Sequence, residues 1–443
     1  MPRQLAAYPV RLNRLLTDRL STFSPFFSLL LLYNLAVQLY GLLLRLAAPF
    51  VPKSAAWVTG RQGLLLRIQQ TVGADPAPRL WMHCASLGEF EQGRPLLEEL
   101  RRRHPELKIV LTFFSPSGYE VRKNWPGADY IFYLPLDTAA HARAFLDAVR
   151  PELVFFVKYE FWHHYLSELK RRGITTVAVS AIFRPGQVFF QPWGGFFRRM
   201  LNCFTHIFTQ NEASAVLLRG IGLRQVAVAG DTRFDTVTAT AAARPRQLPL
   251  LDAFVSDWAP VFIIGSSWTD DLPILTPLLR RYQQELRFIV APHEISEANL
   301  LAVEATIPGL TLRYSLATPE NAPTARLLLI DNVGLLSQLY RYGHFAYIGG
   351  AFGKGLHNTL EAAAFGLPLF FGPTYTKFQE AVTLVALGCA FPVRTPEELQ
   401  TAFGRLFYEE TDRLRVQDAA LDYVHEQAGA TGRILNQLAM SNE

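Results

Sequence analysis

Short apolar runs alternate with longer amphipathic stretches along the chain from residue 80 onward. Apolar runs of this length are typical of parallel strands that are buried on both faces, and the amphipathic stretches are typical of crossover helices. The pattern therefore predicts an α/β fold. The predicted strands form two series, the first at 80–83, 108–113, 152–157, 174–180 and 206–209, and the second at 261–265, 287–291, 326–330, 345–348 and 368–371.

A stretch rich in Pro and Ala separates the two series and predicts an interdomain linker at 239–250. We expect two Rossmann-like, doubly wound domains, at 56–238 and 251–443. A chain of 443 residues is long enough for two such cores. Ligands of open α/β sheets bind beyond the carboxyl ends of the strands, so the turns from strand to helix should carry the site.

The N-terminal part of the chain is apolar over residues 25–50, a length that suits a membrane, and Arg11, Arg14 and Arg19 precede it. We predict that residues 1–55 form a membrane anchor or interfacial segment, with an apolar helix packed on the N-terminal domain as the alternative. The pattern leaves open whether this segment spans the membrane or lies on it.

Composition narrows the classes of function. Half of the residues are hydrophobic and 18% are charged, which excludes a disordered chain, and the net charge of +5 suits anionic partners. The three cysteines, Cys84, Cys203 and Cys389, form no CxxC pair, so neither a disulfide framework nor a zinc cluster is supported. We predict no bound metal and no cofactor. Nucleic-acid binding is disfavoured, since no basic stripe with interleaved aromatic residues occurs.

Two turns of the N-terminal half carry carboxylates. After the first strand, Ser86 and Gly88 shape a turn that ends in Glu89, which is well placed for a general base. The same pattern fits a residue that only caps the next helix, which we expect to begin near residue 91. After another strand, Lys158 and Glu160 stand two residues apart, and these two side chains fit either a catalytic site or a structural ion pair.

The C-terminal half carries a Gly-rich turn at 349–355, followed by a helix predicted to open near His357. These glycines would let the backbone approach a phosphate, Asn358 could cap the helix, and Glu361 could bind ribose hydroxyls. A second polar turn at 371–380 favours a nucleotide site over an ordinary tight turn. A lone histidine such as His293, after a neighbouring strand, is more often structural.

Five motifs follow one another along the chain. They are Ser-x-Gly-Glu at 86–89, Lys-x-Glu-x-Trp at 158–162, Gly-x-x-Arg-Phe-Asp at 230–235, Gly-Ser-Ser-Trp at 265–268, and Gly-Gly…His-Asn-x-x-Glu-Ala at 349–362. Together with the apolar N-terminus they resemble the lipid A-specific 3-deoxy-D-manno-octulosonic acid (Kdo) transferases, over nearly the whole chain. The resemblance implies the GT-B glycosyltransferase architecture of two Rossmann-like domains.

The resemblance also implies a reaction: inverting transfer of Kdo from CMP-Kdo to a lipid A precursor (lipid IVA) in lipopolysaccharide biosynthesis, at the cytoplasmic face of the bacterial inner membrane. Glu89 would be the base, and Glu160 and Arg233 would stabilise the transition state. The acceptor would contact Ser86, Gly88 and Lys158. The donor would contact Pro292, His293, Val333, Gly334, Leu335, Asn358, Thr359, Leu360 and Glu361.

Three positions depart from the family pattern. Many members carry Lys where Arg233 stands, Pro-Arg-His at 292–294, and Met-Gly-Glu at 333–335. The replacement of Arg by His293 removes one expected cation from the donor site. Two other functions stay open at this point: a GT-B transferase or epimerase that uses a UDP-sugar, and a non-catalytic, membrane-bound nucleotide-binding protein. The number of Kdo units and the oligomeric state are not encoded in these patterns.

Overall fold

A computed structural model describes residues 25–440 apart from 245–246 and 258. The chain divides into two compact units, one made of Met1–Thr232 and Thr431–Glu443 and the other of Arg233–Ala430. Each unit is built on a seven-stranded sheet whose paired strands are all parallel. The two doubly wound α/β units confirm the predicted fold class.

The sheet of the first unit has the strand order β3-β2-β1-β4-β5-β6-β7. Its strands are β1 (Arg79–Cys84), β2 (Lys108–Phe113), β3 (Tyr130–Tyr133), β4 (Leu153–Val157), β5 (Thr175–Ala181), β6 (His206–Thr209) and β7 (Val226–Val228). Its helices are α2 (Pro25–Ala47), α3 (Pro52–Gly60), α4 (Leu64–Thr71), α5 (Leu87–Arg103), α6 (Pro116–Arg122), α7 (Ala139–Val149), α8 (His163–Arg171), α9 (Gly195–Leu201) and α10 (Glu212–Gly220), with α20 (Ala430–Met440) at the end of the chain.

The second sheet has the order β10-β11-β9-β8-β12-β13-β14. Its strands are β8 (Val261–Ser267), β9 (Arg287–Pro292), β10 (Thr311–Arg313), β11 (Leu327–Leu329), β12 (Phe345–Ile348), β13 (Leu369–Phe371) and β14 (Ala390–Pro392). Its helices are α11 (Arg233–Ala242), α12 (Pro249–Phe254), α13 (Leu272–Tyr282), α14 (Glu297–Glu304), α15 (Leu336–Leu339), α16 (Leu360–Ala363), α17 (Gln379–Ala386), α18 (Pro396–Tyr408) and α19 (Glu410–Gln427). Single 3₁₀ turns lie at Val188–Phe190, Thr269–Asp271, Tyr314–Leu316, Ala322–Thr324 and Tyr340–Tyr342.

Alternate side chains of the central strands bury themselves on opposite faces of the first sheet. Trp81 of β1 belongs to the core on one face, and its neighbours Leu80 and Met82 belong to the core on the other. The second of these cores also holds Ile434 and Leu438 of α20, so the last helix of the chain closes that face of the first unit. Burial on both faces explains why these strands read as continuous apolar runs.

The boundary between the units differs from the predicted linker at 239–250. Helix α11 packs within the second unit, where the ring of Phe234 meets Tyr423 at 5.4 Å and Asp235 accepts a hydrogen bond from the backbone N–H of Gly429. The predicted linker therefore lies inside the second unit, and residues 431–440 belong to the first unit and not to the predicted C-terminal domain. The apolar face of α20 finds its partners on the first sheet.

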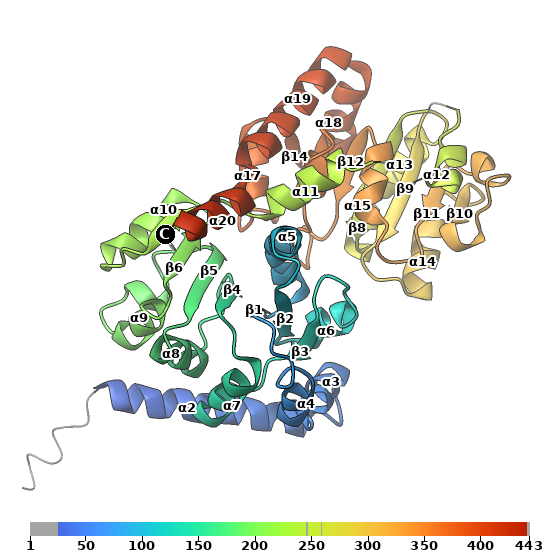
Figure 1. Cartoon of the computed structure of the whole chain (residues 1–443). Coiled ribbons are helices and arrows are strands. Elements are labelled where there is room, and N and C mark those ends of the chain that lie inside the picture. Colours follow the sequence, from blue (N-terminus) through green and yellow to red (C-terminus); the bar gives the residue numbers. More distant parts are fainter. Residues whose placement is uncertain (1–24, 245–246, 258, 441–443) are drawn as a thin grey trace, which may run out of the picture. The chain divides into compact units, whose positions relative to one another are not determined.

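Helix α2 lies against the first unit over much of its length (Figure 1). Near its start Tyr33 donates a hydrogen bond to Asp137, and Asn34 bonds to His164 at 2.6 Å. Further along, the Cβ of any side chain at Gly41 would come within 2.9 Å of Leu136. The opposite side of α2 is apolar and exposed, with leucines at 31, 32, 35, 39, 42, 43 and 46. The first 24 residues of the predicted anchor lie outside the described residues.

Candidate active site

Glu89 lies in the first turn of α5, which begins at Leu87 with Ser86 as its N-cap, earlier than the predicted start near residue 91. Its side chain turns back and accepts backbone N–H groups of Ala85 and Ser86. The capping interpretation of this residue is thus correct as far as the contacts go. Because Glu89 follows β1, a central strand, it also lies at the carboxyl edge of the first sheet, as the sequence predicts.

The environment of Glu89 changes its acidity. Burial, and secondly the negative charge of Glu160, raise the pKa of Glu89 to about 8, against the opposing effects of the two backbone N–H groups and of Lys158. A carboxylate with such a pKa is a far stronger base than an exposed glutamate, and its pKa lies near physiological pH. A residue that served only as a cap would gain nothing from this shift, so the environment of Glu89 suits proton transfer.

Glu160 is held by two ring N–H groups. The indole N–H of Trp162 donates to its Oε2 at 2.6 Å, and Nε2 of His83 lies 3.1 Å from the same oxygen. The imidazole of His83 is fully buried, and its Nδ1 lies 2.9 Å from the hydroxyl of Thr112. The same Nδ1 also lies 3.2 Å from the backbone carbonyl of Thr112. His83 therefore connects Glu160 to Thr112 of the neighbouring strand β2.

The predicted acceptor residues lie in the same two turns as this pair of carboxylates. Lys158 directly follows β4 and has a φ of 62°, in the left-handed region that a side chain such as lysine rarely adopts. Ser86 and Gly88 occupy the start of α5, and the space beside Gly88 is open, with no atom within 4 Å of a Cβ built there. We call Glu89, Glu160, His83 and Trp162 the carboxylate site.

In the second unit, three aromatic rings gather at the carboxyl edge of the sheet. The ring of His293 stacks on Trp268 at 4.5 Å and on His357 at 4.4 Å, and the indole N–H of Trp268 donates to Nε2 of His357 at 3.0 Å. Burial, and secondly the charge of His293, lower the pKa of His357 to about 4, so this ring is neutral. His293 is exposed, and it is part of an aromatic stack and not an isolated structural histidine.

The Gly-rich turn beside these rings is packed differently from the prediction. A Cβ on Gly349 would come within 2.3 Å of the backbone of Ser266, so this glycine allows the loop to touch β8. The N–H of Gly350 donates to the carboxylate of Asp271 at 3.1 Å and is not available to a phosphate. Helix α16 begins at Leu360, not near His357, and is only four residues long, so its dipole is small.

The other predicted donor residues differ in access. Val333 is 87% exposed, Gly334 has a φ of 92°, and Leu335 leads into α15. Thr359 and Leu360 are buried, so their side chains present no surface to a ligand. Pro292 ends β9 beside His293, and Asn358 donates to Glu361 at 3.0 Å while its oxygen accepts the N–H of Leu360.

Arg233, predicted to stabilise the transition state, lies at the start of α11 in the second unit, whereas Glu89 and Glu160 belong to the first. Its guanidinium forms an ion pair with Glu380 of α17 at 2.8 Å. Glu380 lies in the second polar turn that the sequence singles out, and it is nearly buried. Part of the positive charge of Arg233 is therefore balanced within its own unit.

Sequence reasoning missed four members of these sites. Trp162, Trp268 and His357 stand inside the quoted motifs, and His83 lies in the strand before the first motif. The spacing of residues along the chain gives no sign that these side chains contact Glu160 or one another. As for metals, the described residues hold no group of three or more His, Cys, Asp or Glu side chains that could bind an ion.

Comparisons with known proteins agree with these motifs. The family model described as 3-deoxy-D-manno-octulosonic-acid transferase (kdotransferase) matches residues 60–236. Two curated relatives carry the name 3-deoxy-D-manno-octulosonic acid transferase. The one from Chlamydophila psittaci is 25% identical over 376 residues, which cover 80% of this chain and 83% of the relative. The one from Aquifex aeolicus is 26% identical over 334 residues, which cover 74% and 85%. The chain is similar to the Kdo transferases over most of its length.

This similarity confirms the resemblance on which the sequence prediction rests, and it identifies the chain as a glycosyltransferase. A solved structure of UDP-N-acetylglucosamine 2-epimerase has a TM-score of 0.57 and covers 83% of this chain and 97% of its own, at 13% identity. At that identity the likeness shows the fold alone. It agrees with the predicted GT-B architecture of two parallel-sheet domains.

Proposed function

We propose that this chain transfers Kdo from CMP-Kdo to a hydroxyl of a lipid A precursor, with inversion at the anomeric carbon. The names of the family and of its curated relatives support the transferred sugar. One observation carries the chemistry: Glu89 lies beside Glu160 at the edge of the first sheet, and the pKa of Glu89 is raised to about 8.

In the proposed step, the acceptor hydroxyl attacks the anomeric carbon of Kdo as the bond to the CMP phosphate breaks. The proton of the hydroxyl passes to the Glu89 carboxylate, and the bonding electrons leave with the phosphate. A sugar hydroxyl is a poor nucleophile at neutral pH, and a positioned base accelerates such a step by about 10²–10⁴-fold. Glu160, fixed by His83 and Trp162, supplies the negative charge that keeps Glu89 basic.

The donor half of the proposal rests on the second unit. The stacked rings of Trp268, His293 and His357 offer an aromatic surface for a cytosine base, and the exposed loop at 333–335 lies at the end of a neighbouring strand. Arg233 would meet the leaving phosphate in exchange for Glu380. We propose no metal or other cofactor in this step.

The helix α2 supports an attachment to the membrane. Ser28–Ala47 is long and apolar enough to cross a bilayer, and it is the one such helix in the described residues. Its bonds from Tyr33 and Asn34 to the first unit favour a helix that lies along the membrane surface, with its exposed leucines in the lipid. We propose the cytoplasmic face of the inner membrane, where a nucleotide-activated sugar is available.

A donor screen tests the proposal. The purified full chain is incubated with a tetra-acylated lipid A precursor and either CMP-Kdo, generated in the same tube, or UDP-N-acetylglucosamine, and the lipid products are read by mass spectrometry. We expect Kdo-sized additions with CMP-Kdo alone, and their number gives the count of sugars transferred. Products from the UDP-sugar, or binding of CMP without any transfer, would contradict the proposed donor or the catalytic interpretation.

A further inference from the structure

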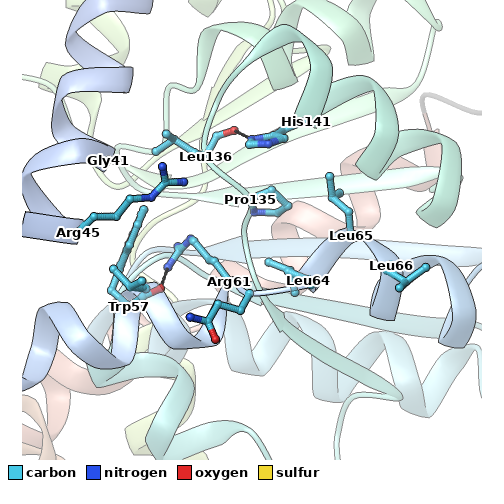
Figure 2. A pocket seen from close by; sticks show the side chains of 13 residues that line it. Gly41, Arg45, Trp57, Arg61, Leu64, Leu65, Leu66, Pro135, Leu136 and His141 are labelled. Carbon is cyan, nitrogen blue, oxygen red and sulfur yellow. Dashed lines mark hydrogen bonds between the residues drawn. The ribbon is translucent and has the colours of Figure 1, made fainter. Parts of the chain in front are cut away.

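A pocket of about 450 Å³ opens in the first unit between α2, the segment from α3 to α4, and the segment that follows β3 (Figure 2). We call it the α2 pocket. It is lined by 13 residues, all in the described part of the chain, which include two arginines, one histidine and no Asp or Glu. None of these residues belongs to the carboxylate site.

The two arginines of the α2 pocket have no acidic partner. Within the described residues, Arg45 of α2 forms neither an ion pair nor a side-chain hydrogen bond, and its side chain is exposed. Arg61 donates only to backbone carbonyls, those of Leu134 at 3.0 Å, Trp57 at 3.2 Å and Phe114 at 2.8 Å. Burial lowers the pKa of Arg61 to about 9, because the charge is desolvated without a carboxylate beside it.

Apart from Gln62 and His141, the rest of the lining is apolar. Figure 2 shows the guanidinium groups of Arg45 and Arg61 toward one end of the pocket, and Leu65 and Leu66 toward the other. The exposed leucines of α2 continue this apolar surface outside the pocket, since Arg45 stands among them in the same helix. A ligand that fits both ends must carry an anionic group and a hydrocarbon part.

The α2 pocket adjoins the carboxylate site through one side chain. The ring of Phe114, which follows β2, lies 6.0 Å from Trp57 in the pocket wall and 4.8 Å from Trp162, whose indole N–H bonds to Glu160. The Arg61 guanidinium also lies over the Phe114 ring, at 5.0 Å. A large amphiphile whose sugar hydroxyl lies at Glu89 is thus long enough to reach the α2 pocket as well.

We propose that the α2 pocket binds a phosphate-bearing lipid, with the phosphate on Arg45 and Arg61 and the hydrocarbon along Leu65 and Leu66. The adjacency to Glu160 favours the phosphorylated lipid acceptor as this ligand, and that assignment rests on the proposed function. A phospholipid of the surrounding membrane has the same chemistry and is the other source.

The test uses Arg45→Glu in the full chain, because Arg45 is exposed and makes no bond that the fold needs. Lys53→Glu, an exposed cation on the neighbouring α3 outside the pocket, is the matched control for general attraction to anionic lipid. Retention of lipid by the detergent-solubilised protein is measured by native mass spectrometry, which requires no sugar transfer. The probes are the tetra-acylated bisphosphorylated disaccharide, its dephosphorylated form, and phosphatidylglycerol.

If the pocket binds the acceptor, Arg45→Glu loses retention of the phosphorylated disaccharide at least tenfold and Lys53→Glu does not. The KM for the lipid acceptor then rises similarly, while kcat and the KM for CMP-Kdo stay unchanged. Loss of phosphatidylglycerol retention alone assigns the pocket to membrane phospholipid. The proposal is overturned if Arg45→Glu and Lys53→Glu retain both phosphorylated lipids equally well. It is also overturned if the wild-type protein retains the dephosphorylated disaccharide as well as the phosphorylated one. Failure of Kdo transfer with retention intact refutes only the proposed function.

Discussion

The carboxylate site of the first unit depends on acidic side chains, whereas the ring stack of the second unit consists of uncharged aromatic side chains. The first places Glu89 near Glu160 at a buried sheet edge, so the pKa of Glu89 responds to both burial and a neighbouring charge. The second stacks Trp268, His293 and His357, and the lowered pKa values of its two histidines keep the rings neutral at physiological pH. In the proposed function, one fold used twice provides proton transfer in one copy and recognition of a flat base in the other.

Replacement of the proposed base, Glu89, should cause the largest loss of activity. Glu89→Gln keeps the size of the side chain and an oxygen for the backbone N–H groups of Ala85 and Ser86, but it cannot take a proton. We expect kcat to fall by about 10²–10⁴-fold, with no change in CMP affinity. Steady-state kinetics and calorimetric CMP titration measure the two quantities. Glu98→Gln, an exposed residue of the same helix, is the control, and a parallel loss of CMP binding would contradict the division of roles.

The ring stack should show the reverse behaviour. His293→Ala removes the exposed ring and leaves the hydrogen bond between Trp268 and His357 intact. Stacking on a base contributes about 1–3 kcal/mol, so we expect CMP affinity to fall by at least about fivefold, with kcat at saturating donor nearly unchanged. His293→Phe should restore most of the affinity, which titration calorimetry can check. An unchanged affinity in His293→Ala would exclude the stack from the donor site.

The pH dependence of transfer gives a smaller, sharper test of the first site. Since the base must be deprotonated, the rate should rise tenfold per pH unit and level off near the pKa of Glu89, at about pH 8. Glu160→Gln removes the second cause of this shift while burial, the larger cause, persists, so the midpoint should move to lower pH without reaching the ordinary value for glutamate. Rate profiles of both proteins, with Glu168→Gln on α8 as control, would decide. If the midpoint of the profile is the same in Glu160→Gln as in the wild type, the two carboxylates do not interact.

The apolar pattern alone predicted ten strands, and the four that it missed are the edge strands β3, β7, β10 and β14. Central strands such as β1 are buried along their whole length, which makes their sequence signal continuous. In contrast, all three residues of β10 are only half-buried, and β14 has a single buried residue. An edge strand has a neighbour on one side only and needs fewer apolar residues, so its pattern is weak.

For the candidate site, the sequence predicted which residues lie at the strand ends but not which side chains contact one another. Glu89, Glu160 and His293 each come directly after a strand that the apolar pattern predicts. Their positions at the carboxyl edges of the sheets could therefore be predicted from the sequence. The support of Glu160 by His83, the stacking of Trp268 and the pairing of Arg233 with Glu380 depend on side-chain directions across long sequence separations. The role of the Gly-rich turn in phosphate binding stays a prediction, because Gly349 is also required for close packing on β8 and the sequence pattern is the same for both roles.

The return of α20 to the first unit has a consequence for synthesis of the chain. Domains generally fold in order as they leave the ribosome. Here the first 232 residues emerge without the helix whose Ile434 and Leu438 cover one face of their sheet. The whole second unit must be translated before that face can close. The first unit is therefore completed only after the second has been made, and a ribosome that stops before Ile434 releases a first unit with one face of its sheet exposed to water.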